Sequence, residues 1–119
     1  MQRLLSLQNG NSGFGHLCKQ LLVVTVDMGS VLFDDEWYDM RTNAGIYVMN
    51  LSYALHYHRV AHCILNCWRH AENDELRYKI SGIPRNEVPV VYVSCGAVPK
   101  EFKVAESPRT PVEKIFTIH

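Results

Sequence analysis

The sequence predicts an α+β protein, and more narrowly one half of an α/β sandwich, from two observations. Residues 21–26 and 88–94 are apolar runs with the length and β-branched content of buried strands. Between them, apolar residues recur at helical spacing over residues 43–57, which predicts one long helix. Because a sheet of so few strands is not stable alone, we expect it to need further partners.

The first half of the chain begins with a loop. Residues 8–15 contain three glycines and two asparagines, a composition that disfavours regular structure. The strand at 21–26 follows and is ended by Asp27 and Gly29. The acidic, aromatic stretch 33–38 is predicted to be a surface loop that leads into the long helix.

The long helix carries apolar residues on two faces. One stripe consists of Ala44, Val48, Leu51 and Leu55, and a second of Ile46, Met49, Tyr53 and Tyr57. A helix of this kind is buried on more than one side, in a core or in a subunit interface. We therefore expect residues 46–57 to contribute to a homodimer interface.

The second half of the chain has clear boundary signals. Residues 63–67 are predicted to be a short extended piece, followed by a helix that Asn73 caps and that ends at Gly82 and Pro84. The strand at 88–94 follows. Thr110, with a proline after it and a glutamate three positions on, forms a capping box that predicts a last helix.

Composition limits the classes of function. A chain of 119 residues is predicted to be one domain. Its 12 basic and 12 acidic residues balance, which argues against nucleic acid and anionic membranes as partners. The apolar runs are too short to span a bilayer, and the start lacks signal-peptide features. The 4 cysteines have no compact spacing and are interpreted as reduced thiols of a cytoplasmic protein.

Histidines and cysteines gather in one stretch of the chain, and zinc prefers these ligands. The stretch contains His56, His58, His62, Cys63, Cys67 and His70. It has no Cys-x-x-Cys pair, and His56 and His58 would point to different sides of a helix. We therefore expect no metal and interpret Cys63 and Cys67 as small buried apolar residues, with a zinc-binding module as a minor alternative.

Several short segments, in order, resemble the C-terminal half of the FMN-dependent nitroreductase-like flavoproteins. They are Gly13-Phe14-Gly15, Met49-Asn50-Leu51 with Ala54-Leu55-His56, Cys63-Ile64-Leu65-Asn66, Ile83-Pro84, Gly96 and Ser107-Pro108-Arg109. The resemblance implies a nitroreductase-like α/β sandwich that lacks its N-terminal half. Where the family often has glycine after its long helix, this chain has Arg59, so we expect the helix to end differently.

The resemblance also implies a function. It implies a homodimeric oxidoreductase in which FMN lies between subunits and passes hydride from NAD(P)H to a small-molecule acceptor. Ile64, Leu65 and Asn66 would face the flavin ring, whose reduced form backbone N–H groups can stabilise. Arg109, beside a predicted helix start, would hold the phosphate. The alternative is a non-catalytic dimerising remnant of a truncated flavoprotein.

Overall fold

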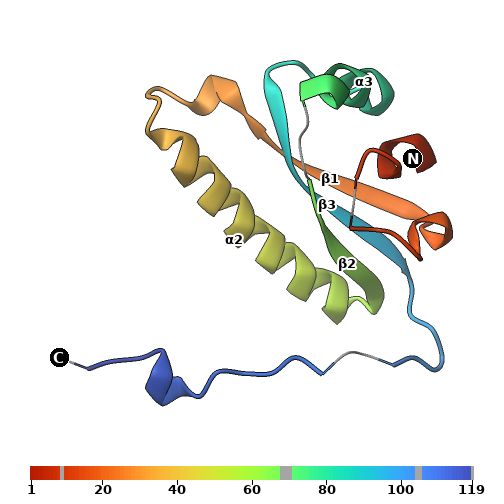
Figure 1. Cartoon of the computed structure of the whole chain (residues 1–119), viewed down its shortest axis with the longest axis vertical. Coiled ribbons are helices and arrows are strands. Elements are labelled where there is room, and N and C mark those ends of the chain that lie inside the picture. Colours follow the sequence, from red (N-terminus) through yellow and green to blue (C-terminus); the bar gives the residue numbers. More distant parts are fainter. Residues whose placement is uncertain (9, 68–70, 104–105, 119) are drawn as a thin grey trace.

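The computed structural model describes residues 1–8, 10–67, 71–103 and 106–118 (Figure 1). The helices are α1 (Gln2–Leu5), α2 (Glu36–Tyr57) and α3 (Ala71–Ser81), and the strands are β1 (Gln20–Asp27), β2 (Val60–Asn66) and β3 (Glu87–Ala97). This composition confirms the predicted α+β class. No helix in the described ranges is long and apolar enough to cross a membrane.

The strands form one antiparallel sheet in the order β1-β3-β2. β3, the longest and most buried strand, takes the middle position and pairs with both neighbours. Residues opposite each other in the ladder point to the same face. The register therefore places Tyr92 and Leu65 on one face, and Val93 and Ile64 on the other.

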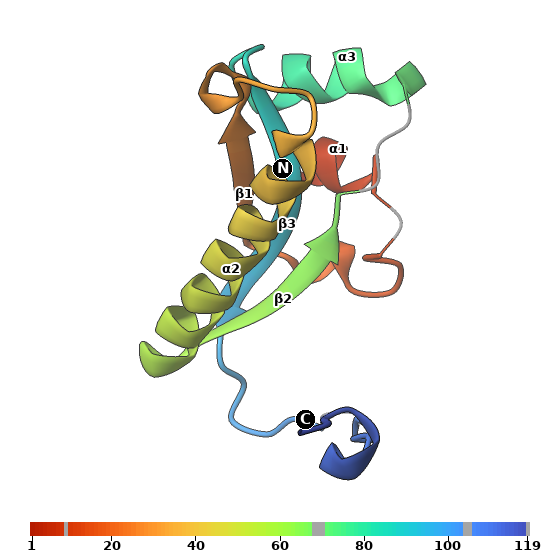
Figure 2. The same cartoon turned by 90° about the vertical axis from the view of Figure 1, so that its left-hand side faces the viewer.

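The helices cover the two faces unequally. Helix α2 crosses one face, and α1 and α3 lie on the other (Figures 1 and 2). On the α1/α3 face, six buried residues form one cluster: Leu4, Leu5, Cys18, Leu65, Cys67 and Tyr92. On the α2 face the buried residues include Val24, Ala44, Val48, Val93 and Cys95. The first predicted stripe of the long helix therefore does face the sheet.

Helix α2 begins at Glu36, so the prediction of a loop over 33–38 is wrong for its last three residues. The Glu36 carboxylate accepts hydrogen bonds from the backbone N–H groups of Leu32, at 2.7 Å, and Phe33, at 3.2 Å. These bonds close the turn that starts the helix. Glu36 and Asp39 also place negative charge at the positive end of the helix dipole, which favours the earlier start.

The end of α2 corrects the expectation drawn from Arg59. The last helical hydrogen bond runs from the His58 N–H to the Ala54 carbonyl at 3.0 Å, and the next residue turns the chain as a glycine would. Arg59 then takes the left-handed conformation, with φ of 56°. An L-residue with a Cβ is strained there, so this turn carries a conformational cost that a glycine would avoid.

The second half differs from the prediction at two helix starts. Helix α3 begins at Ala71, so Asn73 lies inside the helix and is not its cap. The predicted end is confirmed, because Gly82 has φ of 71° and its N–H donates to the Tyr78 carbonyl at 3.0 Å. The predicted last helix is only a single 3₁₀ turn, Val112–Lys114, with no side-chain cap.

The C-terminal segment after β3 explains the missing last helix. It runs away from the sheet past the end of α2 (Figures 1 and 2). Its large apolar side chains are exposed: Val98, Phe102, Val112, Ile115, Phe116 and Ile118. A short helix needs tertiary packing to be stable, and this segment has none in the described chain.

Candidate functional site

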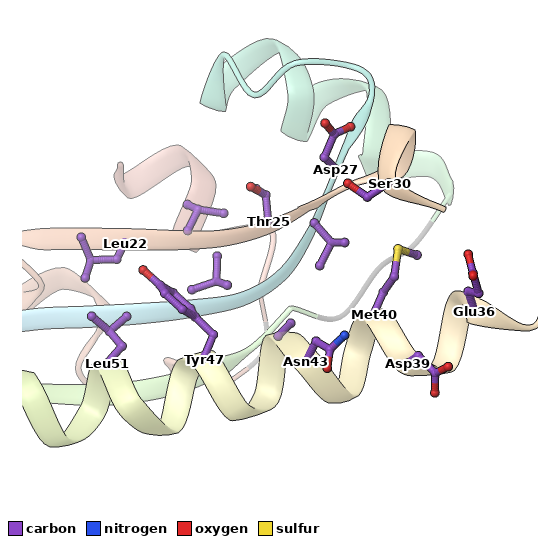
Figure 3. Close-up of a pocket in the computed structure, with 14 residues that line it drawn as sticks. Leu22, Thr25, Asp27, Ser30, Glu36, Asp39, Met40, Asn43, Tyr47 and Leu51 are labelled. Atoms are coloured by element: carbon purple, nitrogen blue, oxygen red, sulfur yellow. The ribbon is translucent and has the colours of Figure 1, made fainter. Parts of the chain in front are cut away.

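A groove lies between α2 and β1, along the edge of β1 that no described strand covers (Figure 3). Its volume is about 1020 Å³. Leu22 and Val24 form one wall, and Ala44, Tyr47 and Leu51 form the other. The walls are therefore apolar over most of their length, as is usual for ligand pockets.

Polar side chains gather at one end of the groove (Figure 3). Asp27 Oδ1 accepts hydrogen bonds from Gly29 N–H at 2.9 Å and from Asn86 Nδ2 at 2.8 Å. These bonds hold the pKa of the Asp27 carboxyl below its usual value, the Gly29 bond contributing most. Glu36 is likewise hydrogen-bonded to the loop before α2. Asp27 and Glu36, two of the acidic residues at this end of the groove, therefore stabilise the local fold.

The predicted flavin segment, Ile64 to Asn66, is part of strand β2, which confirms the extended piece predicted there. Leu65 is only 2% exposed and packs in the α1/α3 cluster. Ile64, its neighbour, is 48% exposed on the opposite face. The Asn66 carbonyl accepts a hydrogen bond from Gln8 Nε2 at 2.9 Å, while its side chain is exposed. Only Ile64 and Asn66 therefore have side chains accessible to a ligand.

Arg109, the predicted phosphate-binding residue, is exposed in the C-terminal segment. This segment lies beyond the end of the sheet where β2 begins, whereas Asn66 is at the other end of β2 (Figures 1 and 2). A single copy of the chain therefore does not bring Arg109 to the Ile64–Asn66 segment.

The histidine and cysteine cluster does not form a metal centre in the part of the chain described. No three His, Cys, Asp or Glu side chains there are placed to hold an ion, and His70 lies outside the described residues. None of the four cysteines forms a disulfide. Cys67 is buried, as predicted, whereas Cys63 is exposed, which corrects its interpretation as a buried residue.

The α1/α3 face contains buried polar groups that the sequence did not indicate. Arg77 is 1% exposed and forms an ion pair with Asp74 one helical turn earlier. Tyr92 is equally buried, and burial raises the pKa of its phenol. Arg77 has the spacing of a surface residue of a short helix, so no sequence signal distinguishes it. These groups are enclosed in the core and support the fold.

A second, smaller pocket, here called the notch, begins where β2 ends. It has a volume of about 330 Å³. It is lined by Val26, Trp37, Met40, Arg41, Asn66, Cys67, Val88, Pro89 and Val90. Trp37 and Arg41 were missed because the stretch before Asn43 was not expected to be helical throughout. Their spacing of four positions is the signal that a helix assignment would have revealed.

The groove and the notch define a small α+β domain with ligand-sized pockets on one face of its sheet. No protein-family model matches the chain, and no curated protein matches it.

Proposed function

We propose that this chain is the subunit of a self-associating flavoprotein of nitroreductase type, with an FMN site shared between copies. The observation that carries the proposal is the outer face of α2. Its second apolar stripe, Ile46, Met49, Tyr53 and Tyr57, is 48% to 82% exposed. A contiguous apolar patch on a long helix is unusual on a monomer and is typical of an interface.

The separation of the predicted flavin residues supports a shared site. Arg109 lies on a segment that leaves the domain, while Ile64 and Asn66 remain on β2. If Arg109 holds the FMN phosphate, the exposed C-terminal segment of one copy must reach the β2 strand of another. Its exposed apolar side chains, such as Phe102 and Phe116, would be buried by that contact.

In this proposal the chemistry belongs to the cofactor. A bound FMN would supply hydride transfer from NAD(P)H to a small-molecule acceptor. The protein would hold the phosphate through Arg109, whose guanidinium can form two parallel hydrogen bonds. Ile64 would offer an apolar contact beside the ring.

A non-catalytic dimerising remnant is the second candidate, and one observation favours it. The Leu65 side chain is buried in the core, and β2 is a regular strand whose backbone is hydrogen-bonded to β3 on one side. Fewer groups are then free to bind a flavin than a loop would provide. Self-association would persist in this case without FMN binding.

Sedimentation velocity at micromolar concentration tests the association. We expect the parent chain to be a dimer or larger, and Tyr53→Glu to dissociate it, because a carboxylate would be desolvated in an apolar contact. Leu17→Glu is the matched control, since Leu17 is also an exposed apolar residue but lies outside α2. A monomeric parent chain would overturn the proposal.

Titration with FMN, followed by fluorescence quenching, separates the two candidates. We expect Arg109→Ala to bind FMN about tenfold or more weakly than the parent, because a charge-assisted contact is lost. Lys103→Ala is the matched control, as an exposed cation of the same segment. A dimer that binds no FMN would support the non-catalytic candidate instead.

A further inference from the structure

We propose that the notch binds a planar aromatic carboxylate, with the carboxylate on Arg41 and the ring on the apolar floor below it. The proposal does not depend on flavin binding. The notch, at about 330 Å³, lies at the lower end of the range of ligand pockets, which suits a small, one-ring ligand.

The notch exists because the strands of the sheet differ in length. β2 ends at Asn66, which lies opposite Val91 of β3. β3 extends beyond this point to Glu87 and is paired there with β1 alone among the described strands. The sheet surface over residues 88–90 is therefore uncovered by β2 and forms the floor of the notch.

The floor is apolar and irregular. Val88, Pro89 and Val90 form it, with Val26 of β1 beside them. The register of β1 and β3 shifts at this point, because Val24 lies opposite Val91 and Thr25 opposite Pro89. Val90 is thus the extra residue of a bulge, a feature often found beside binding sites. A flat ring can lie against such a surface more closely than a branched ligand.

The first turns of α2 provide a positive charge, Arg41, at the opening of the notch. The Arg41 guanidinium carbon lies 4.7 Å from the centre of the Trp37 ring. This cation–π contact holds the guanidinium in place without using its hydrogen-bond donors along the edge. Among the described residues, Arg41 has no carboxylate partner within 4.0 Å. A ligand carboxylate could therefore pair with the Arg41 guanidinium through two parallel hydrogen bonds.

A second arginine shows what a completed pair looks like in this chain. Arg85 lies over the Tyr78 ring at 4.8 Å, nearly the same stacking distance. Its guanidinium, however, binds the Glu75 carboxylate at 2.5 Å. Arg85 does not line the notch. Both arginines stack on an aromatic ring, but only Arg85 is paired with a carboxylate. At Arg41 a ligand would supply that carboxylate.

Asn66 provides the polar contact at the far side of the notch. Its backbone carbonyl is fixed by Gln8, while its side chain is exposed and lines the notch. The amide can donate or accept a hydrogen bond to a ring substituent. The site therefore combines a cation, an apolar floor and one neutral polar group, which is the chemistry of an aromatic carboxylate.

Nuclear magnetic resonance of the ¹⁵N-labelled protein, titrated with benzoate, tests the proposal. We expect saturable shifts of the Trp37 indole N–H, assigned with Trp37→Phe, and of the Asn66 side-chain amide. Benzamide has nearly the same shape without the charge and should bind about tenfold more weakly. Inorganic phosphate, which has charge but no ring, should not reproduce the shift at Asn66.

Substitutions then identify the cation. Arg41→Gln should weaken benzoate binding about tenfold, and Arg41→Lys should weaken it less, because the charge remains without the planar fork. Arg85→Gln is the matched control and should leave binding unchanged. Equal affinity for benzoate and benzamide, or equal losses in the Arg41 and Arg85 variants, would overturn the proposal. So would the absence of any shift in the parent protein.

Discussion

The two faces of the sheet differ in how completely they are covered. On the α1/α3 face, Leu5, Leu65 and Tyr92 are each at most 2% exposed, and the buried cluster includes residues from both halves of the chain. On the α2 face, one long helix covers the sheet incompletely and leaves the groove and the notch open. The first face also has a pocket of about 710 Å³ between α1, α3 and β1, beside its buried cluster. It is the cluster that gives this face the properties of a stable core, whereas the α2 face has those of a binding surface.

Adjacent residues of β2 show the same difference within one strand. Leu65 points into the buried cluster of the α1/α3 face and Ile64 to the α2 face, because successive side chains of a strand alternate. Both were predicted to face a flavin. The comparison teaches that one of them is needed for folding, whereas the other is free to take part in binding.

The largest expected effect comes from truncating these two neighbours. Leu65→Ala should lower the free energy of unfolding by about 3 kcal/mol, because it leaves a cavity in a closed cluster. Ile64→Ala should cost about 1 kcal/mol or less, since the side chain is already half in solvent. Urea denaturation at one protein concentration measures both.

Equal losses of unfolding free energy in Leu65→Ala and Ile64→Ala would contradict the difference between the two faces. They would mean that the α2 face is also closed in solution, for example by a second copy of the chain. Repeating the measurement over a range of protein concentrations distinguishes these cases, because a subunit interface makes the stability concentration-dependent.

The sequence predicted those parts of the fold that depend on local pattern. The apolar run at 21–26 and the helical spacing over 43–57 correspond to β1 and to most of α2. Gly82 and Pro84 marked the end of α3 correctly, because a left-handed glycine closes a helix by local geometry. The capping box at Thr110 failed because a cap stabilises only a helix that also has something to pack against.

The candidate sites were less predictable, since they depend on contacts between distant segments. The notch combines Trp37 and Arg41 of α2 with Asn66 of β2 and Val90 of β3. No spacing in the sequence reveals that β2 ends early enough to uncover β3. The burial of Leu65 likewise follows from the register with Tyr92, which only the folded sheet defines.

A smaller effect is expected where α2 ends. Arg59 has φ of 56°, so Arg59→Gly should raise the free energy of unfolding by about 0.5–1 kcal/mol. The gain is partial, because glycine also increases the freedom of the unfolded chain. Arg59→Ala is the control and should give no gain, since alanine keeps the strained Cβ. Thermal unfolding of the three proteins measures the difference.

This substitution sharpens the comparison because it strengthens only the α2 side of the sheet. If α2 is the weaker layer, amide hydrogen exchange in Arg59→Gly should slow along α2 and remain unchanged at Leu65 and Tyr92. Uniform slowing over both faces would show instead that the two layers unfold as one unit.

The smallest expected effect concerns the other end of α2, where Asp27 fixes the loop that leads into the helix. Its carboxylate accepts hydrogen bonds from Gly29 and Asn86, which lower its pKa in the folded protein below the usual 3.8. A carboxyl whose folded pKa is depressed stabilises the fold above its unfolded pKa, and this contribution is lost as the pH falls through the folded value.

In Asp27→Asn the amide oxygen can still accept both bonds but the side chain no longer titrates. We therefore expect the free energy of unfolding of the parent to fall more steeply than that of Asp27→Asn as the pH is lowered below about 4, and the two slopes to agree near neutral pH. Identical slopes over the acidic range would mean that Asp27 does not hold this loop, and that the α2 layer is positioned by its contacts with the sheet alone.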